Sequence, residues 1–462
     1  MTYMEETVAT IHIYHTNDVH SHFENWPQIS RFLKQRKQQA EAKGEAVFLF
    51  DIGDHIDRSH PFTEGTEGKG NIELLNEAEY DTVTIGNNEG ITMSKESLNA
   101  LYEDAQFDVV LCNLTDLDGA LPYWAKTSKI LETADGVRIG ITGATAPYYA
   151  FYEQLGWRVT EPHAALKEVA NSLRPQCDVL ICLSHLGINE DRLLAAERPE
   201  FDVILGGHTH HLLQNGEWHN DTLIAAAEKF GHYVGHIQVD VDRMTNQVLH
   251  MTAEVFPTQL MKRTEEDVAE VNGYLNEGEE ALEVPVFYNP SALPQRLTGN
   301  SPLSSLFGRA LLTYLDADCA LFNAGIFLGS LDEGWVTKGD LHSLLPHPIN
   351  PCLVRLDGED LLTIYEQSLD PKWTELPIRG LGFRGTLMGS MIHEHLFLNS
   401  DGQLFAGNRL VEPGSTYTLA TLDMFTFGYF FPLLKEAPKE YIMPEMLRDV
   451  LGWYGRKYFN EG

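Results

Sequence analysis

The chain has 462 residues, which predicts two or three domains of ordinary size. With 33 Lys and Arg against 67 Asp and Glu its net charge is −34, which excludes purely electrostatic binding to DNA, RNA or anionic lipid. A hydrophobic fraction of 43% is enough for a full core and argues against disorder. If the ligand is an anion, something other than Lys and Arg has to supply the positive charge.

The first half of the chain alternates short apolar strands with amphipathic segments. Strands are expected at 10–14, 46–50, 82–85, 109–112, 139–142, 179–183, 203–205, 223–226 and 233–241. Helices such as 27–42 and 164–173 lie between them. This alternation indicates a layered α/β domain.

The second half begins with an acidic, helix-compatible stretch at 264–282, and three prolines between 283 and 301 suit a linker. An α+β pattern then continues to the end of the chain. We therefore expect a first domain over 1–260, an acidic helical connector over 261–284 and a smaller second domain over 285–462.

Neither the first residues nor the cysteines indicate export. Met1 to Glu6 contain no basic or apolar segment of the kind found in a signal peptide, and no apolar run reaches the roughly 20 residues of a membrane span. The five cysteines are scattered and form no Cys-x-x-Cys pair, so we expect reduced thiols rather than disulfides or a thiolate metal site. A cytoplasmic location without membrane contact is the expectation.

Polar segments follow several of the expected strands. They read Thr-Asn-Asp-Val-His at 16–20, Gly-Asp at 53–54, Gly-Asn-Asn-Glu at 86–89, Ser-His at 184–185 and Gly-Gly-His-Thr-His at 206–210. Open α/β sheets usually place ligands at such strand ends. Residues i and i+2 of an extended chain point the same way, so Asp18 with His20, and His208 with His210, can each direct two ligands to one point.

Together these segments offer a mixed set of carboxylates, imidazoles and one carboxamide: Asp18, His20, Asp54, Asn87, His185, His208 and His210. Imidazole with oxygen ligands suits Mn, Zn or Fe better than Ca or Mg. Seven ligands are too many for one tetrahedral ion, but they fit two divalent ions that share a carboxylate. Two ions about 3.5–4 Å apart activate water and neutralise phosphoryl oxygens. The set therefore predicts phosphoester hydrolysis.

The order of these segments resembles the 5′-nucleotidase family of the calcineurin-like metallophosphoesterase superfamily, in its bacterial, cytoplasmic type without a signal peptide. The second half is similar to that family's C-terminal domain through Phe-Asn-Ala-Gly at 322–325 and Val-Thr-Lys-Gly-Asp-Leu at 336–341. The resemblance implies a four-layer αββα metallophosphoesterase sandwich followed by a smaller α+β substrate-binding domain.

The resemblance also implies how the ligands divide between two metals. One metal would be held by Asp18, His20, Asp54 and His210, and the other by Asp54, Asn87, His185 and His208, with Asp54 bridging. Asp51 and Asp57 are rival carboxylates in the same segment, and Asp51 is a candidate partner for a ligand histidine.

The sequence departs from the family at its catalytic histidine and at the Asp that orients it. Asn88 and Ile91 stand at those positions. Asn88, which we expect at the catalytic position, can donate a hydrogen bond but cannot transfer a proton. Loss of general acid help costs typically about 10²–10⁴-fold in rate. A neighbouring histidine, His22 or His55, is a candidate replacement.

The second domain departs from the family as well. Leu328 stands where the family has an Arg that grips the nucleotide, and Asp-Met-Phe-Thr-Phe at 423–427 replaces a glycine-rich segment. Phe425, Phe427 or Tyr429 can supply one of the family's two base-stacking rings, with His347 or Pro348 at the position of the other ring. The expected substrate contacts are Asn323, Gly325, Arg379, Arg384, Phe425 and Phe427.

These observations predict a dinuclear-metal hydrolase, in the simplest case a 5′-nucleotidase-like phosphatase of nucleotide catabolism that acts on a nucleotide or a related phosphorylated metabolite. Asn88 favours two alternatives whose leaving groups need less protonation, a 2′,3′-cyclic-nucleotide phosphodiesterase and a nucleotide pyrophosphatase. An alternative of another class is a catalytically weakened nucleotide sensor. No nucleic-acid polymer is expected as a partner, and the sequence does not specify an oligomeric state.

Overall fold

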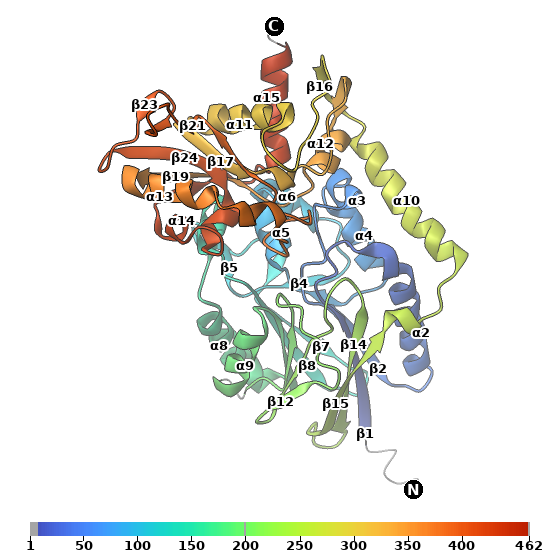
Figure 1. Ribbon diagram of the computed structural model, residues 1–462. Coiled ribbons are helices and arrows are strands. Elements are labelled where there is room, and N and C mark those ends of the chain that lie inside the picture. Colours follow the sequence, from blue (N-terminus) through green and yellow to red (C-terminus); the bar gives the residue numbers. More distant parts are fainter. Residues whose placement is uncertain (1–7, 198–199, 461–462) are drawn as a thin grey trace. The chain divides into compact units, whose positions relative to one another are not determined.

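The computed structural model describes residues 8–197 and 200–460 (Figure 1). The chain divides into two compact units, residues 1–278 and 279–462.

Unit 1 contains two β-sheets, and within each sheet the central strands run parallel to one another. The first has the order β15-β14-β1-β2-β3-β4-β6. Its strands are β1 (Val8–Thr16), β2 (Ala46–Asp51), β3 (Thr82–Val83), β4 (Asp108–Val110), β6 (Ala125–Lys126), β14 (Tyr233–Asp242) and β15 (Val248–Pro257). The second has the order β12-β13-β11-β10-β8-β7. Its strands are β7 (Ser128–Glu132), β8 (Arg138–Thr145), β10 (Val179–His185), β11 (Val203–Gly206), β12 (Glu217–His219) and β13 (Thr222–Ala225).

The strand β10 shows how the layers are packed. Val179, Ile181 and Leu183 lie in the core between the two sheets. The alternate residues Leu180 and Cys182 belong to a second core on the outer face. A strand that is covered on both faces reads as a continuous apolar run, which is the pattern seen in the sequence.

Helices cover the outer faces of the two sheets. Apolar residues of α8 (Pro162–Leu173) and α9 (Ile188–Glu197) form the outer core with β10 and β11. On the first sheet, α2 (Trp26–Glu41) packs against β2. Figure 1 shows α8 and α9 beside the second sheet and α2 beside the first. The expected four-layer αββα sandwich is confirmed, and all nine expected strands are present.

The remaining elements of unit 1 are short. They are a strand pair, β5 (Leu114–Asp116) with β9 (Trp157–Val159), and the helices α3 (Pro61–Gly65), α4 (Lys69–Glu77), α5 (Asn87–Thr92), α6 (Lys95–Leu101) and α7 (Tyr149–Gln154).

The acidic helix α10 (Glu265–Leu282) packs on unit 1 along much of its length. Near its start, Arg31 Nη2 donates to Asp267 Oδ2 at 2.9 Å, a bond that lowers the pKa of Asp267 to about 2. The Tyr274 ring lies 5.2 Å from the Phe62 ring. A Cβ on Gly278 would lie 2.2 Å from the Phe62 nitrogen, so this position admits no side chain without movement of the backbone.

Unit 2 contains a five-stranded sheet of order β20-β17-β24-β19-β25 and one large hydrophobic core. Its strands are β17 (Cys319–Asn323), β19 (Pro351–Asp357), β20 (Met391–Glu394), β24 (Thr416–Leu422) and β25 (Lys439–Tyr441). Three further strands form a small sheet, β21 (Leu396–Leu398), β22 (Leu404–Ala406) and β23 (Arg409–Leu410). The helices are α11 (Pro302–Leu315), α12 (Lys338–Leu344), α13 (Gly358–Ser368), α14 (Pro432–Glu436) and α15 (Leu447–Asn460).

The proline-containing stretch after α10 is not a simple linker. It contains β16 (Pro285–Asn289), which pairs antiparallel with β18 (Gly334–Thr337). Phe287 in this strand is fully buried in the core of unit 2. The prolines lie at the start of the strand and after it, where no ladder hydrogen bond from their nitrogen is needed.

The cysteines Cys112, Cys177, Cys182, Cys319 and Cys352 are free thiols. Within the described residues no helix is both long and apolar enough to span a membrane. The cytoplasmic location stays a prediction.

The close approach at Gly278 generates a stability prediction. Gly278→Ala should lower the free energy of unfolding by about 1–3 kcal/mol, because overpacking against the Phe62 backbone outweighs the better helix propensity of alanine. Gly273, in the same helix, has open space around it, so Gly273→Ala should raise the free energy by up to about 1 kcal/mol. Urea denaturation of both variants measures the difference, and equal shifts would contradict the packing.

Candidate metal centre

The carboxyl ends of four strands, and the loops that follow them, supply most of the predicted ligands. Asp18 and His20 follow β1, and Asp54 follows β2, both in the first sheet. In the second sheet His185 is the last residue of β10, while His208 and His210 follow β11. The ligands therefore come from the carboxyl ends of parallel strands in both sheets.

The local backbone at these ligands differs from the expectation. Five of them have positive φ angles: Asp18 (52°), His20 (50°), Asp54 (52°), His208 (69°) and His210 (56°). The i, i+2 pairs are therefore not extended, and that reason for their convergence was wrong. Non-glycine residues at positive φ cost energy and cluster at functional sites.

The first group of ligands consists of Asp18, His20 and His210. The His20 and His210 Nε2 atoms are 3.2 Å apart. Asp18 Oδ1 lies 3.4 Å from His210 Nε2 and 3.8 Å from His20 Nε2. One donor atom of each residue therefore points to a common centre.

The second group consists of Asp54, His185 and His208, with one donor atom of each within 4.8 Å of the others. The His185 and His208 rings are 5.2 Å apart. Burial and the neighbouring His185 lower the pKa of His208 to about 4, so this imidazole is neutral at pH 7 and free to act as a ligand.

Asp54 joins the two groups through one oxygen. Its Oδ2 lies 3.6 Å from His20 Nε2 and 3.4 Å from His185 Nε2. The other oxygen, Oδ1, accepts a hydrogen bond from the Asn88 backbone at 2.7 Å. This arrangement fixes the carboxylate with Oδ2 between the two histidines, the position that a bridging ligand requires.

Two further atoms fit a metal centre. His185 Nδ1 lies 2.7 Å from the Ile52 carbonyl, which leaves Nε2 facing Asp54. His185 Nε2 and Asn87 Oδ1 are both buried without a hydrogen-bond partner in the described chain. Burial lowers the pKa of His185, but the Asp54 carboxylate outweighs it and raises the pKa to about 10. Metal binding exchanges such a proton for a cation. The donor set fits two divalent ions.

The residues around the ligands hold them in place. Asn17 Nδ2 donates to Asp18 Oδ2 at 2.7 Å. The buried Glu89 accepts from the backbone nitrogens of Gly86, Asp54 and Ile56 at 2.8–3.0 Å. The sequence pattern did not reveal these roles of Asn17 and Glu89, although both residues stand inside the polar segments that follow the strands.

The carboxylate partner of a ligand histidine is Asp57 and not Asp51. Asp57 Oδ2 lies 3.7 Å from His20 Nδ1. Asp51 instead accepts from Thr16 Oγ1 at 2.6 Å and from the Gly53 nitrogen at 3.0 Å. The prediction for Asp51 was wrong because this side chain points back to the end of β1.

Comparison with known proteins agrees with this geometry. Residues 11–212 match the Calcineurin-like phosphoesterase family, and residues 281–427 match the 5′-nucleotidase, C-terminal domain family. The chain is 42% identical to the uncharacterized metallophosphoesterase YunD of Bacillus subtilis, over 96% of this chain and 98% of YunD. The chain belongs to the 5′-nucleotidase family of calcineurin-like phosphoesterases.

Two solved structures share the fold of this family member. The NAD nucleotidase of Haemophilus influenzae superposes with a TM-score of 0.65 at 15% identity, covering 98% of this chain and 97% of that one. The 5′-nucleotidase precursor of Thermus thermophilus superposes with a TM-score of 0.58 at 18% identity, covering 97% of both chains. These likenesses extend over both units.

Asn88, at the family's catalytic histidine position, is turned toward the ligands. Its Nδ2 lies 2.8 Å from His20 Nδ1 and donates to the Ile56 carbonyl at 3.1 Å. The side chain thus contacts a predicted metal ligand. The catalytic role of Asn88 stays a prediction.

The two histidines considered as replacements differ in access. His55 is buried against the Trp26 ring, and burial lowers its pKa to about 3, so it does not suit proton transfer to a substrate. The His22 side chain is 44% exposed and its ring lies 3.7 Å from the Phe230 ring. Of the two, only His22 faces solvent.

In unit 2, Asn323 and Gly325 lie against the loop before β20. Asn323 Nδ2 and the Gly325 nitrogen both donate to the Met388 carbonyl, at 2.8 and 2.9 Å. A Cβ on Gly325 would lie 2.0 Å from the Leu387 oxygen. Both residues are buried, and the structure shows them in loop packing; substrate contact by them stays a prediction.

Two of the rings considered for base stacking, Phe425 and His347, are core residues, while stacking by Phe427, Tyr429 or Pro348 stays a prediction. Phe425 is completely buried and packs on Phe430 and Phe431, so it is a core residue. Phe427 is half-buried at the edge of the same core. His347 is buried too, with its ring stacked on Phe383 at 5.0 Å. An alternating aromatic pattern reports a sheet or core position as readily as a ligand site.

The two arginines differ in exposure. Arg379 is exposed and Arg384 half-buried, with the Arg384 backbone nitrogen donating to His347 Nδ1 at 2.9 Å. Their predicted contact with substrate stays a prediction.

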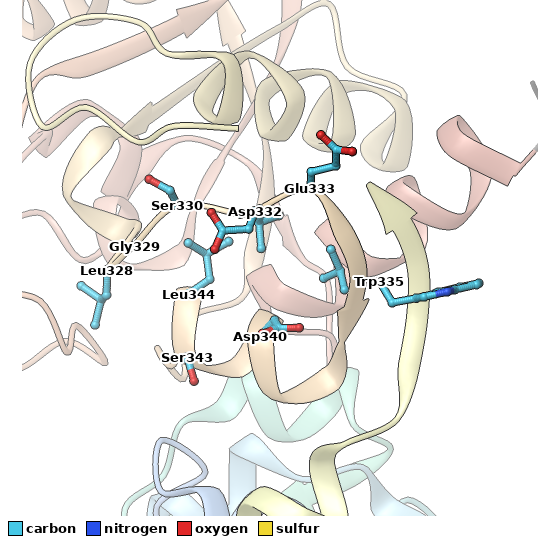
Figure 2. Close-up of a pocket in the computed structure, with 11 residues that line it drawn as sticks. Leu328, Gly329, Ser330, Asp332, Glu333, Trp335, Asp340, Ser343 and Leu344 are labelled. Atoms are coloured by element: carbon cyan, nitrogen blue, oxygen red, sulfur yellow. The ribbon is translucent and has the colours of Figure 1, made fainter. Parts of the chain in front are cut away.

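A cavity of about 250 Å³ in unit 2 lies beside Leu328, the residue at the position of the family's arginine (Figure 2). Its lining includes three carboxylates, Asp332, Glu333 and Asp340, and contains no Lys or Arg among the described residues. In Figure 2 Trp335 projects away from the other labelled side chains. A cavity with this charge does not suit a phosphate group.

The close packing of Gly86 against Asp54 and His185 generates a prediction about metal binding. A Cβ on Gly86 would lie 2.0 Å from Asp54 Oδ1 and 2.6 Å from His185 Cε1. Gly86→Ala should therefore displace Asp54 and weaken metal affinity by about 10–100-fold, the usual effect of disturbing the support of metal ligands. Mn²⁺ titration with measurement of bound metal checks this, with Gly273→Ala as control. Unchanged affinity would contradict the proposed ligand set.

Proposed function

We propose that the chain hydrolyses phosphate monoesters at a centre of two divalent cations, with a nucleotide or a related phosphorylated metabolite as substrate. The observation that carries this proposal is the position of Asp54 Oδ2, within 3.6 Å of donor atoms in both ligand groups. Membership of the 5′-nucleotidase family supports the nucleotide substrate. Mn, Zn and Fe all suit the mixed ligands.

We assign the predicted ligands to the two cations as follows. Asp54 would bridge, with Asp18, His20 and His210 on one side and Asn87, His185 and His208 on the other. Two bound cations lower the pKa of a water molecule and neutralise phosphoryl oxygens. The Ile52 carbonyl and Asp57 orient His185 and His20 from behind.

The position of Asn88 sets the leaving-group preference that we propose. An amide cannot deliver a proton to the departing oxygen. Esters whose leaving groups are stable without protonation should therefore react fastest. This supports the two related activities, hydrolysis of 2′,3′-cyclic nucleotides and of nucleotide pyrophosphates, as second candidates.

A panel assay tests the proposed function. The substrates are a nucleoside 5′-monophosphate, a 2′,3′-cyclic nucleotide, a dinucleotide and 4-nitrophenyl phosphate. For the cyclic nucleotide and the dinucleotide, an added phosphatase releases phosphate from the product. Metal-loaded protein should give phosphate from at least one of the four. Asp54→Asn should reduce kcat/KM by about 10²–10⁴-fold, because removing the bridge costs several kcal/mol of transition-state stabilisation. Asp401→Asn, at an exposed loop of unit 2, is the matched control. No hydrolysis of any ester would refute the proposal.

A leaving-group series separates the enzyme from the weakened sensor. We expect kcat/KM to fall steeply as the pKa of the leaving phenol rises across substituted phenyl phosphates, because protonation is missing. Asn88→His with Ile91→Asp should flatten that dependence and raise the rate on the poorest leaving group, by up to about 10²–10⁴-fold. If nucleotides bind tightly to the unchanged chain and none is turned over, the sensor is correct.

A further inference from the structure

A cavity of about 360 Å³ adjoins the metal centre within unit 1. It lies at the carboxyl ends of strands of the second sheet. The residues that line it include Pro147, Tyr148, Tyr149, Pro162, Leu186 and His208. His208 belongs to the second ligand group, so the cavity and the metal centre share this residue. Its volume lies in the range of roughly 300–1,000 Å³ typical of small-molecule sites.

Two tyrosines give the cavity aromatic walls. The Tyr148 ring meets the His208 ring edge to face, at 6.1 Å and 72°. Tyr149 is the first residue of α7 and is 52% exposed, although it is a large apolar ring. An exposed aromatic ring that lines the same cavity as a metal ligand offers a stacking surface to a bound molecule.

The charge of the residues that line the cavity determines which molecules it can bind. Its acidic residues are Glu161 and Glu190, and it contains no Lys or Arg among the described residues. Glu190 lies 2.8 Å from His163 Nε2, while Glu161 caps α8 by accepting from the His163 and Ala164 nitrogens at 3.0 and 2.7 Å. A second phosphate or a carboxylate would meet two carboxylates of this lining and no Lys or Arg among its described residues. An uncharged or cationic ring would meet no such repulsion, and a cation would also be attracted to the tyrosine faces.

We propose that this cavity is the leaving-group subsite of the enzyme and takes an aromatic ring without negative charge. The inference rests on the proposed function. The phosphoryl group would occupy the metal centre, and the ring attached through the ester oxygen would extend along Tyr149. In the reaction the water oxygen forms a bond to phosphorus as the bond to the ester oxygen breaks. The released alcohol or phenol keeps the electron pair and takes up a proton, while water loses one.

The test compares four esters on the full-length, metal-loaded protein: phenyl phosphate, 4-(trimethylammonio)phenyl phosphate, 4-carboxyphenyl phosphate and 2,2,2-trifluoroethyl phosphate. KM of the unchanged chain should be lowest for the cationic ring and highest, among the three aryl esters, for the carboxylated one. Tyr149→Ala should raise KM for phenyl phosphate by about three- to tenfold, the usual size of one stacking contact. KM for the trifluoroethyl ester should change less than twofold, because it has no ring.

Three further variants separate stacking from general damage. Tyr149→Phe keeps the ring and should restore the KM for phenyl phosphate. Tyr123→Ala removes a tyrosine that is 68% exposed and does not line the cavity, so it should leave all four values unchanged. Glu190→Gln should narrow the difference between the cationic and the carboxylated ester. Bound metal and the thermal midpoint confirm that each variant is folded.

Two results would overturn the inference alone. One is an equal effect of Tyr149→Ala on the trifluoroethyl and phenyl esters, and the other is no effect on either, while the unchanged chain hydrolyses both. Failure of the metal-loaded unchanged chain to hydrolyse any ester would overturn the proposed function, and the inference with it. The two kinds of failure are therefore distinguishable in the same experiment.

Discussion

The Asp54 carboxylate is the point on which the structure of unit 1 depends. It stands after β2 in the first sheet, and its Oδ2 faces His185, the last residue of β10 in the second sheet. The same oxygen faces His20, which follows β1. A buried carboxylate is costly unless charged or hydrogen-bonding partners surround it. The strand ends of both sheets converge on this residue and supply those partners, which is the physical reason why the ligands meet there.

Holding the ligands at this point requires an unusual backbone. Two loops run side by side, with the Asp18 nitrogen donating to the Gly53 carbonyl at 3.0 Å and the His20 nitrogen to the Asp54 carbonyl at 2.8 Å. These bonds keep Asp18, His20 and Asp54 at positive φ, a conformation that costs about 1–3 kcal/mol per residue. Gly53 allows the approach, because a Cβ there would lie 2.2 Å from the Gly86 nitrogen. The buried scaffold thus holds these ligands in a strained backbone conformation.

This arrangement also answers how a chain of net charge −34 can act on an anion. The proposed positive charge comes from two divalent cations and is confined to one spot. The surroundings do not add to it: the cavity beside Leu328 and the cavity beside His208 are both lined by carboxylates without Lys or Arg in the described part of the chain. Substrate selection by such surfaces would favour the uncharged part of a phosphate ester over a second anionic group.

The sequence by itself determined the strand pattern of unit 1, the family and the residue types that assemble around Asp54. These properties are local, because a strand appears as a run of alternating or apolar residues and a ligand loop as a short polar motif after it. Only the tertiary structure decided which polar or aromatic residue does what. It buried Phe425 in a core, made 285–289 a strand, chose Asp57 over Asp51 beside His20, and left Tyr149 exposed next to His208. Burial and proximity depend on residues far away in the chain, and no local pattern contains them.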